Sequence, residues 1–291
     1  MDFILATKIF YAVIVFLFGI TIGSFLNVLI YRIPKKENIV SENSHCMSCN
    51  HRLYPIDLVP LFSWIFLGGK CRYCKAKISP QYPIVEAING IMYVLIFWFI
   101  CGAEPKLSLL GYCAAFSALL VTAVIDWRTM EIPDSMWITV LVGGIIVYID
   151  ELIAEGFDWT CLLERVIGFF AASGILFLLA VITKGGMGGG DIKLMAACGF
   201  LLGWKVVLLS LVMGGVIGTL YLVFCAVKNK GKVPRKVPFA PHLAAAVVIC
   251  MFVGTKILEW YFALCGITHV HNHNHAHDTA ATIFSRLANL I

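Results

Sequence analysis

Long apolar runs, separated by short polar segments, form the main pattern along the chain. Eight such runs occupy residues 9–31, 83–101, 107–125, 136–149, 162–183, 192–204, 206–227 and 240–265. A helix needs roughly 20 apolar residues to cross a bilayer, so the runs predict an all-α polytopic membrane protein of about eight transmembrane helices. The sixth run is too short to cross unless it is tilted or extends into its flanks.

The first run is expected to remain as a span. It is longer than the apolar region of an ordinary signal peptide, and no A-x-A cleavage site follows it. Gly19 and Gly23 have the G-x-x-x-G spacing that suits close packing of membrane helices. Composition shows no internal repeat along the chain.

The composition agrees with a membrane protein. Of the 291 residues, 60% are hydrophobic and 13% are charged. A soluble domain is usually about 45–50% apolar and about 25% charged. These values argue against a water-soluble enzyme, a disordered chain and a nucleic-acid-binding protein.

Charges in the connecting segments predict the orientation in the membrane. Lys and Arg are concentrated in residues 32–82 and 228–236, whereas residues 150–161 carry Asp and Glu. The positive-inside rule places the two basic segments in the cytoplasm and the acidic one outside. With eight spans, both termini are then outside, and the short loops 126–135 and 184–193 lie at the cytoplasmic face.

The first basic segment contains two Cys-x-x-Cys pairs separated by 21 residues, a spacing close to that of a zinc ribbon. The four cysteines are Cys46, Cys49, Cys71 and Cys74. Four thiolates can close a tetrahedron around Zn²⁺, which makes a structural site. Disulfides or free thiols are the alternative, but the cytosol keeps thiols reduced. The segment is about 50 residues long and has a small core, so a metal would stabilise it. We therefore expect a zinc-ribbon-like cytoplasmic loop domain.

Two carboxylates, Asp126 and Asp191, lie at the ends of predicted spans. Asp126 follows the third run directly, and Asp191 opens the sixth. Both fall at the cytoplasmic face, and ionisable groups at membrane depth are functional candidates by default. Two adjacent carboxyls do not both ionise easily, so one can hold a proton while the other acts as a base, as in aspartic proteases.

Glycines surround the second carboxylate. They are Gly185, Gly186, Gly188, Gly189 and Gly190. A backbone without side chains would let a peptide strand approach closely and let the loop act as a gate. The simpler alternatives are a plain flexible loop for the glycines and helix capping or solvation for Asp126 and Asp134.

Together these segments resemble the prepilin peptidases, or type IV leader peptidases, which are membrane aspartic proteases of the GxGD type. The resemblance covers about residues 16 to 245. It rests on residues 23–34, the two cysteine pairs, residues 78–86, Ile125-Asp126-Trp127-Arg128, Gly188-Gly189-Gly190-Asp191, Gly203-Trp204 and Pro238-Phe239-Ala240-Pro241. Ala240 departs from the family, which more often has glycine there.

The resemblance implies an eight-helix fold in the bacterial inner membrane. It also implies cleavage of the basic leader of prepilins or pseudopilins, after a glycine and at the cytoplasmic face. N-methylation of the new N-terminal residue with S-adenosylmethionine is implied as well. By the family's motifs, Asp126 and Asp191 are catalytic, and the cysteines bind zinc. Asp134, Gly188, Gly190 and Lys193 are supporting residues.

The resemblance does not locate the S-adenosylmethionine site. Asn27, Arg32, Glu86 and the first cytoplasmic loop are candidates by position. An ion pair or a head group at the membrane interface is the alternative role for Glu86 and Lys193. We divide the chain into a first helix (1–31), a cysteine loop domain (32–82), a membrane peptidase core (83–265) and a His-rich tail (266–291). The tail is expected to be solvated, with metal binding as the alternative.

Three other functions remain open. One is another GxGD intramembrane protease, although no Tyr-Asp pair stands within a span. A second is a transporter, which would predict inverted repeats and charges at mid-span. The third is a zinc-stabilised assembly protein without catalysis. No nucleic-acid partner is expected.

Overall fold

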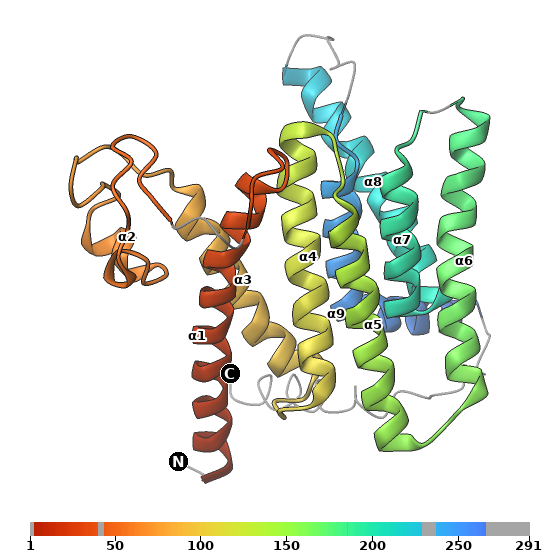
Figure 1. Cartoon of the computed structure of the whole chain (residues 1–291). Helices are drawn as coiled ribbons and strands as arrows, with labels where there is room; N and C mark the ends of the chain where they lie inside the picture. Colours follow the sequence, from red (N-terminus) through yellow and green to blue (C-terminus); the bar gives the residue numbers. More distant parts are fainter. Residues whose placement is uncertain (1–2, 40–43, 185, 229–236, 266–291) are drawn as a thin grey trace. The chain divides into compact units, whose positions relative to one another are not determined.

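A computed structural model of the chain describes residues 3–39, 44–184, 186–228 and 237–265. Apart from two isolated β-bridges, these residues form helices, turns and loops. The helices are α1 (Phe3–Arg32), η1 (Pro55–Asp57), α2 (Phe62–Phe66), α3 (Gln81–Leu95), η2 (Ile96–Ile100), α4 (Leu107–Thr129), α5 (Asp134–Glu155), α6 (Trp159–Ile182), α7 (Gly189–Leu202), α8 (Trp204–Lys228) and α9 (Ala240–Leu264). The chain divides into two compact units, Met1–Trp98 and Phe99–Ile291 (Figure 1).

Each of the eight apolar runs corresponds to a helix of the structure. Seven of these helices are long and apolar enough to span a membrane. The eighth, α7, has 14 residues, in agreement with the short sixth run. The run over 136–149 underestimates α5, because the helix continues through Asp150, Glu151 and Glu155 after the apolar pattern stops.

The first unit pairs α1 with α3 through small residues. A Cβ atom on Gly19 would lie 2.8 Å from the Cα of Gly90, and one on Gly23 would lie 2.7 Å from the Cα of Glu86. Asn89 donates a hydrogen bond of 2.7 Å from Nδ2 to the carbonyl of Gly19. The G-x-x-x-G spacing therefore marks a contact where two backbones touch, as expected.

The second unit packs α4 on α5 and α9, and α7 on α5 and α6 (Figure 1). Glycines again allow the close approaches. A Cβ atom on Gly199 of α7 would lie 2.1 Å from the carbonyl oxygen of Gly168 on α6. The α7 backbone is thus in direct contact with α6 near its C-terminal end.

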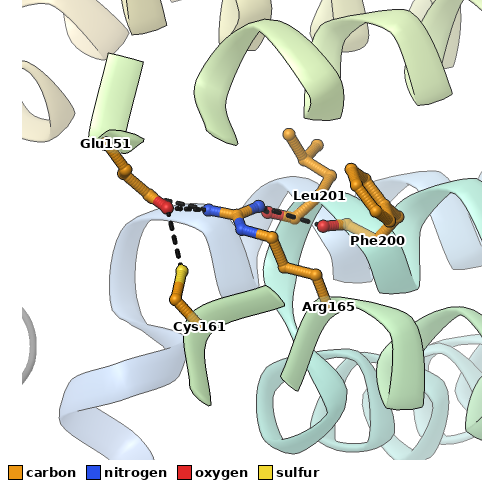
Figure 2. A network of polar contacts seen from close by, with 5 residues as sticks. All are labelled: Glu151, Cys161, Arg165, Phe200 and Leu201. Atoms are coloured by element: carbon orange, nitrogen blue, oxygen red, sulfur yellow. Dashed lines mark hydrogen bonds and ion pairs between the residues drawn. The ribbon is translucent and has the colours of Figure 1, made fainter. Parts of the chain in front are cut away.

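An ion pair between a buried arginine and a half-buried glutamate holds the same end of α7 (Figure 2). Arg165 on α6 donates to the carbonyls of Phe200 and Leu201, each at 3.0 Å. It also pairs with both carboxylate oxygens of Glu151 on α5, at 2.5 and 2.6 Å. A cation at a helix C-terminus is favourable because the last carbonyls carry partial negative charge. Three helices are joined at this point.

Candidate active site and metal centre

Asp126 lies in the last turns of α4 and is 6% exposed. The expectation that it directly follows a span is corrected, because α4 continues to Thr129 and ends at Met130, whose φ is 56°. Its Oδ2 accepts a hydrogen bond of 3.1 Å from the backbone N–H of Ala240. That N–H belongs to the first residue of α9 and has no partner within the helix.

Asp191 lies in the first turn of α7 and is 8% exposed. Its buried Oδ1 has no hydrogen-bond partner among the described residues. Its carboxyl group is close enough to Asp126 to interact with it electrostatically. The structure therefore brings together the two carboxylates that the sequence singled out, and both are largely shielded from solvent.

The glycines before Asp191 have distinct environments. A Cβ atom on Gly190 would lie 2.7 Å from the Cβ of Ile132, whereas one on Gly189 would meet nothing within 4 Å. A Cβ atom on Gly188 would lie 3.2 Å from Oδ2 of Asp191. Gly190 is explained by close packing, and Gly188 leaves space beside the carboxylate. Gly185 lies outside the described residues.

Asp134 and Lys193 form an ion pair on the surface. Nζ of Lys193 lies 2.7 Å from Oδ1 of Asp134, and both side chains are more than half exposed. The same oxygen accepts a hydrogen bond of 2.8 Å from Nε1 of Trp137. The pair links the N-terminal turns of α5 and α7, so Asp134 is a partner of Lys193. The alternative of an ion pair for Lys193 is the one observed.

The sequence did not predict which residues of α9 lie beside Asp126. His242 is 6% exposed and interacts electrostatically with Asp126. Its Nδ1 lies 3.0 Å from the carbonyl oxygen of Pro238, and its ring centroid lies 5.1 Å from that of Tyr221. The signal for this contact in the sequence is the segment Pro238-Phe239-Ala240-Pro241.

The second site is the cysteine cluster of the first unit. The sulfur atoms of Cys46, Cys49, Cys71 and Cys74 all lie within 4.8 Å of one another. The backbone N–H of Ser48 is the largest of the effects that lower the pKa of the Cys46 thiol to about 6. A lowered pKa favours the thiolate at Cys46. At Cys74 the backbone N–H of Ala76 lowers the pKa, but burial and hydrogen bonds with the other three cysteines outweigh it and raise the pKa to about 11. The donor set and the spacing fit a closed four-sulfur zinc site.

The two halves of the cluster are equivalent turns, 25 residues apart. In the first, Cys46 N–H donates to His51 C=O at 3.0 Å, and Asn50 N–H donates to Cys46 C=O at 2.8 Å. In the second, Cys71 N–H donates to Ala76 C=O at 2.8 Å, and Lys75 N–H donates to Cys71 C=O at 3.1 Å.

The flanking backbone repeats as well. Asn50 and Lys75 both have left-handed φ angles, 54° and 59°. A β-bridge closes each turn, and the pairs are His45 with Arg52 and Lys70 with Lys77. The two turns therefore share one backbone geometry, although the composition shows no internal repeat.

The chain is similar to known proteins along most of its length. The family model described as "Bacterial Peptidase A24 N-terminal domain" matches residues 17–100, and the "Type IV leader peptidase family" matches residues 113–223. A relative from Bacillus subtilis, named "Prepilin leader peptidase/N-methyltransferase", is 33% identical over 86% of this chain and 98% of its own length. The chain belongs to the type IV leader peptidase family.

Further members of the type IV leader peptidase family carry the same name. The relative from Aeromonas hydrophila is 31% identical over 86% of this chain and 93% of its own length. The relative from Pseudomonas aeruginosa is 29% identical over 91% and 98%. No solved structure matches the chain. Membership of this family favours a leader peptidase over a transporter or a non-catalytic assembly protein.

The side chains considered for S-adenosylmethionine make contacts within the first unit. Oε2 of Glu86 accepts a hydrogen bond of 2.7 Å from Leu61 N–H, and Nδ2 of Asn27 donates to the carbonyl of Tyr82 at 3.1 Å. Arg32 donates to the carbonyl of Asn38 at 3.0 Å. Glu86 and Arg32 thus join helices to the cysteine loop, whereas Asn27 joins α1 to the first turn of α3.

Proposed function

We propose that the chain cleaves the basic leader from prepilins or pseudopilins at the cytoplasmic face, with Asp126 and Asp191 as the catalytic pair. The observation that carries this proposal is the buried, electrostatically coupled pair of carboxylates. They stand at the end of one helix and the start of another, within a chain of the leader peptidase family. The basic loops support the cytoplasmic orientation in a bacterial inner membrane.

The surroundings of the two carboxylates suggest different roles. Asp126 accepts an N–H at the N-terminus of α9, where the helix dipole favours an anion. Asp191 has a buried Oδ1 without a partner among the described residues. Because two adjacent carboxyls do not both ionise easily, the proton belongs on Asp191. Asp126 is then the base and Asp191 the acid.

The reaction follows from these roles. The Asp126 carboxylate takes a proton from a water molecule while the water oxygen forms a bond to the scissile carbonyl carbon. Asp191 donates its proton to the carbonyl oxygen, which neutralises the developing oxyanion. The tetrahedral intermediate then collapses, the C–N bond breaks, and the leaving amine takes the proton that Asp126 holds. The hydroxyl proton returns to Asp191, which restores the starting state.

Methylation of the new N-terminal amine is the second proposed activity. S-adenosylmethionine would supply the methyl group when bound, and its site on this chain stays unassigned. The four cysteines would hold zinc as a structural ion that closes the two turns of the cluster. Asp134, Gly188, Gly190 and Lys193 would support the geometry of α7, and none of them transfers a proton in this scheme.

The test uses the purified full-length protein, a prepilin substrate and mass spectrometry, with and without S-adenosylmethionine. Asp126→Asn and Asp191→Asn keep the shape of each side chain but remove the acid–base pair. Both variants should lose leader cleavage by about 10² to 10⁴-fold. Asp134→Asn is the comparison variant: it removes only the surface ion pair with Lys193, so it should retain far more cleavage than either of the other two variants. A gain of one methyl group on the product demonstrates the second activity.

Cleavage by either catalytic-pair variant at the wild-type rate would overturn the assignment of the pair.

A further inference from the structure

The short helix α2 in the cysteine loop has an exposed apolar face. Phe62, Ile65 and Phe66 are 44%, 62% and 84% exposed, and their i, i+3, i+4 spacing puts them on one side of the helix. We call these three residues the α2 face. Ile56 and Val59, which precede the helix, are 64% and 42% exposed. Apolar side chains of this size gathered in one short segment mark an interaction surface.

The side chains of Ser63 and Trp64 attach α2 to the rest of the loop. The orientation of the α2 face is therefore fixed. Trp64 donates from Nε1 to the carbonyl of Ile78, at 3.4 Å. Its ring lies over Gly69, where an added Cβ would come within 2.9 Å of the ring carbons. Ser63 donates to the carbonyl of Val59 at 2.7 Å. The helix therefore presents a fixed orientation, with Trp64 inward and the α2 face outward.

The charges of the loop are positive. Asp57 pairs with Arg72, whose Nε lies 2.6 Å from Oδ1. Burial raises the pKa of the Asp57 carboxyl, but hydrogen bonds from Arg72, Tyr54 N–H and Tyr73 outweigh that effect, and the pKa lies below its usual value. Four other basic side chains are exposed and form no ion pair within the described part of the chain. They are Arg52, Lys70, Lys75 and Lys77.

The chain holds this loop beside a bilayer. The loop leaves α1 after Arg32 and enters α3 at Gln81. Both α1 and the segment Gln81–Ile100, which α3 and η2 form together, are long and apolar enough to span. Because consecutive spans run in opposite directions, both ends of the loop lie at the same membrane face. Exposed aromatic and aliphatic side chains next to lysines are the composition that partitions into an anionic interface.

We propose that the α2 face inserts into the interfacial region of an anionic lipid leaflet, with Lys70, Lys75 and Lys77 near the lipid phosphates. The basic leader of a prepilin is a poorer occupant, because the positive charge of the loop would repel it. Insertion would keep the cysteine cluster against the membrane surface. This role is independent of leader cleavage and would persist if the proposed function failed.

The experiment measures how close the face lies to lipid. The full-length protein carries a genetically encoded fluorescent amino acid at position 66, and in a control at position 47. Met47 is 68% exposed in the same loop but lies outside α2. Each protein is placed in vesicles of phosphatidylcholine, with or without phosphatidylglycerol, and bromine on the acyl chains serves as the quencher. Zinc content verifies that the loop is folded in every sample.

Bromolipid should quench position 66 more strongly than position 47, and phosphatidylglycerol should increase the difference. Lys70→Gln, Lys75→Gln and Lys77→Gln should each weaken the contribution of phosphatidylglycerol by about fivefold. Equal quenching at the two positions would overturn the proposal. Quenching at position 66 that does not respond to phosphatidylglycerol would also overturn it. A third contrary result is protection of position 66 from both bromolipid and iodide, a quencher in the aqueous phase, because protein would then cover the α2 face.

Discussion

Asp126 accepts a hydrogen bond from the backbone N–H of Ala240, although 114 residues separate them in the chain. The contact joins the C-terminal part of α4 to the first turn of α9. It gives a physical role to the segment Pro238-Phe239-Ala240-Pro241, which turns the chain into α9 and aims one N–H at the carboxylate. Ala240 is fully buried, so the space around this contact is tight.

Substitutions of Ala240 should act through that hydrogen bond. Ala240→Gly keeps the N–H and adds no atoms, so leader cleavage should stay close to the wild-type rate. Ala240→Val adds two methyl groups to a filled site, and overpacking of this kind costs about 1–3 kcal/mol. We expect about a tenfold loss of kcat/KM, because 1.4 kcal/mol corresponds to tenfold. Steady-state kinetics of prepilin cleavage measures kcat/KM for each variant. Unchanged cleavage by the valine variant would show that this contact does not position Asp126.

Gly189 and Gly190 are adjacent glycines in different surroundings, so one alanine substitution serves as the control for the other. Gly190→Ala would place a Cβ atom 2.7 Å from that of Ile132, which forces α7 to shift at Asp191. Gly189→Ala meets nothing, and alanine is a better helix former by about 1 kcal/mol. Gly190→Ala should lose cleavage, and its free energy of unfolding should fall by about 1–3 kcal/mol. Gly189→Ala should keep both, as measured by cleavage and by thermal unfolding in detergent. Equal behaviour of the two would contradict the packing explanation for Gly190.

The ion pair at the other end of α7 should matter for stability. Arg165→Met leaves Glu151 without its cation and leaves the carbonyls of Phe200 and Leu201 without their donor. Breaking a buried pair costs about 3–5 kcal/mol, and the lower end applies because Glu151 is 36% exposed. The double variant Arg165→Met, Glu151→Gln should recover part of the loss, since no unpaired charge remains. Thermal unfolding of the four proteins gives the coupling energy, and additive effects would refute a direct pair.

Metal binding can be tested without an activity assay. The purified protein should contain one zinc ion per chain, and Cys49→Ser or Cys74→Ser should abolish it. Cys265→Ser, an exposed cysteine outside the cluster, is the control and should leave the metal content unchanged. Loss of metal should also expose the loop to proteases, because the closed turns depend on it. A full zinc complement in Cys49→Ser would exclude the four-sulfur site.

The long helices could be predicted from the sequence because a continuous apolar run makes up most of each one, whereas the short helices η1 and α2 have no such run. The two carboxylates could be predicted too, since acidic residues at span ends are conspicuous in such a chain. Their contact with α9 could not, because nothing in a single sequence connects Asp126 with Ala240. The apolar run underestimates α4, because Trp127 to Thr129 continue the helix beyond it.

The cysteine spacing predicted a metal site but not its internal symmetry. That symmetry lies in backbone hydrogen bonds and in the φ angles of Asn50 and Lys75, which composition does not reveal. Likewise, the glycine run before Asp191 suggested flexibility, whereas the structure gives Gly190 a steric reason. In both cases the sequence pattern shows where the site lies, and the backbone geometry explains why those residues occur there.

The contact between Gly168 and Gly199 joins the C-terminal end of α7 to α6. Its backbone touches α6 there, so a tilt of α7 that uses this contact as its pivot would displace Asp191. Eight residues separate the pivot from the carboxylate, an arm of about 12 Å at the helical rise. A tilt of about 5° would therefore move Asp191 by about 1 Å, a displacement that can cost 10²-fold in rate. The position of Asp191 thus depends on the packing at the opposite end of α7.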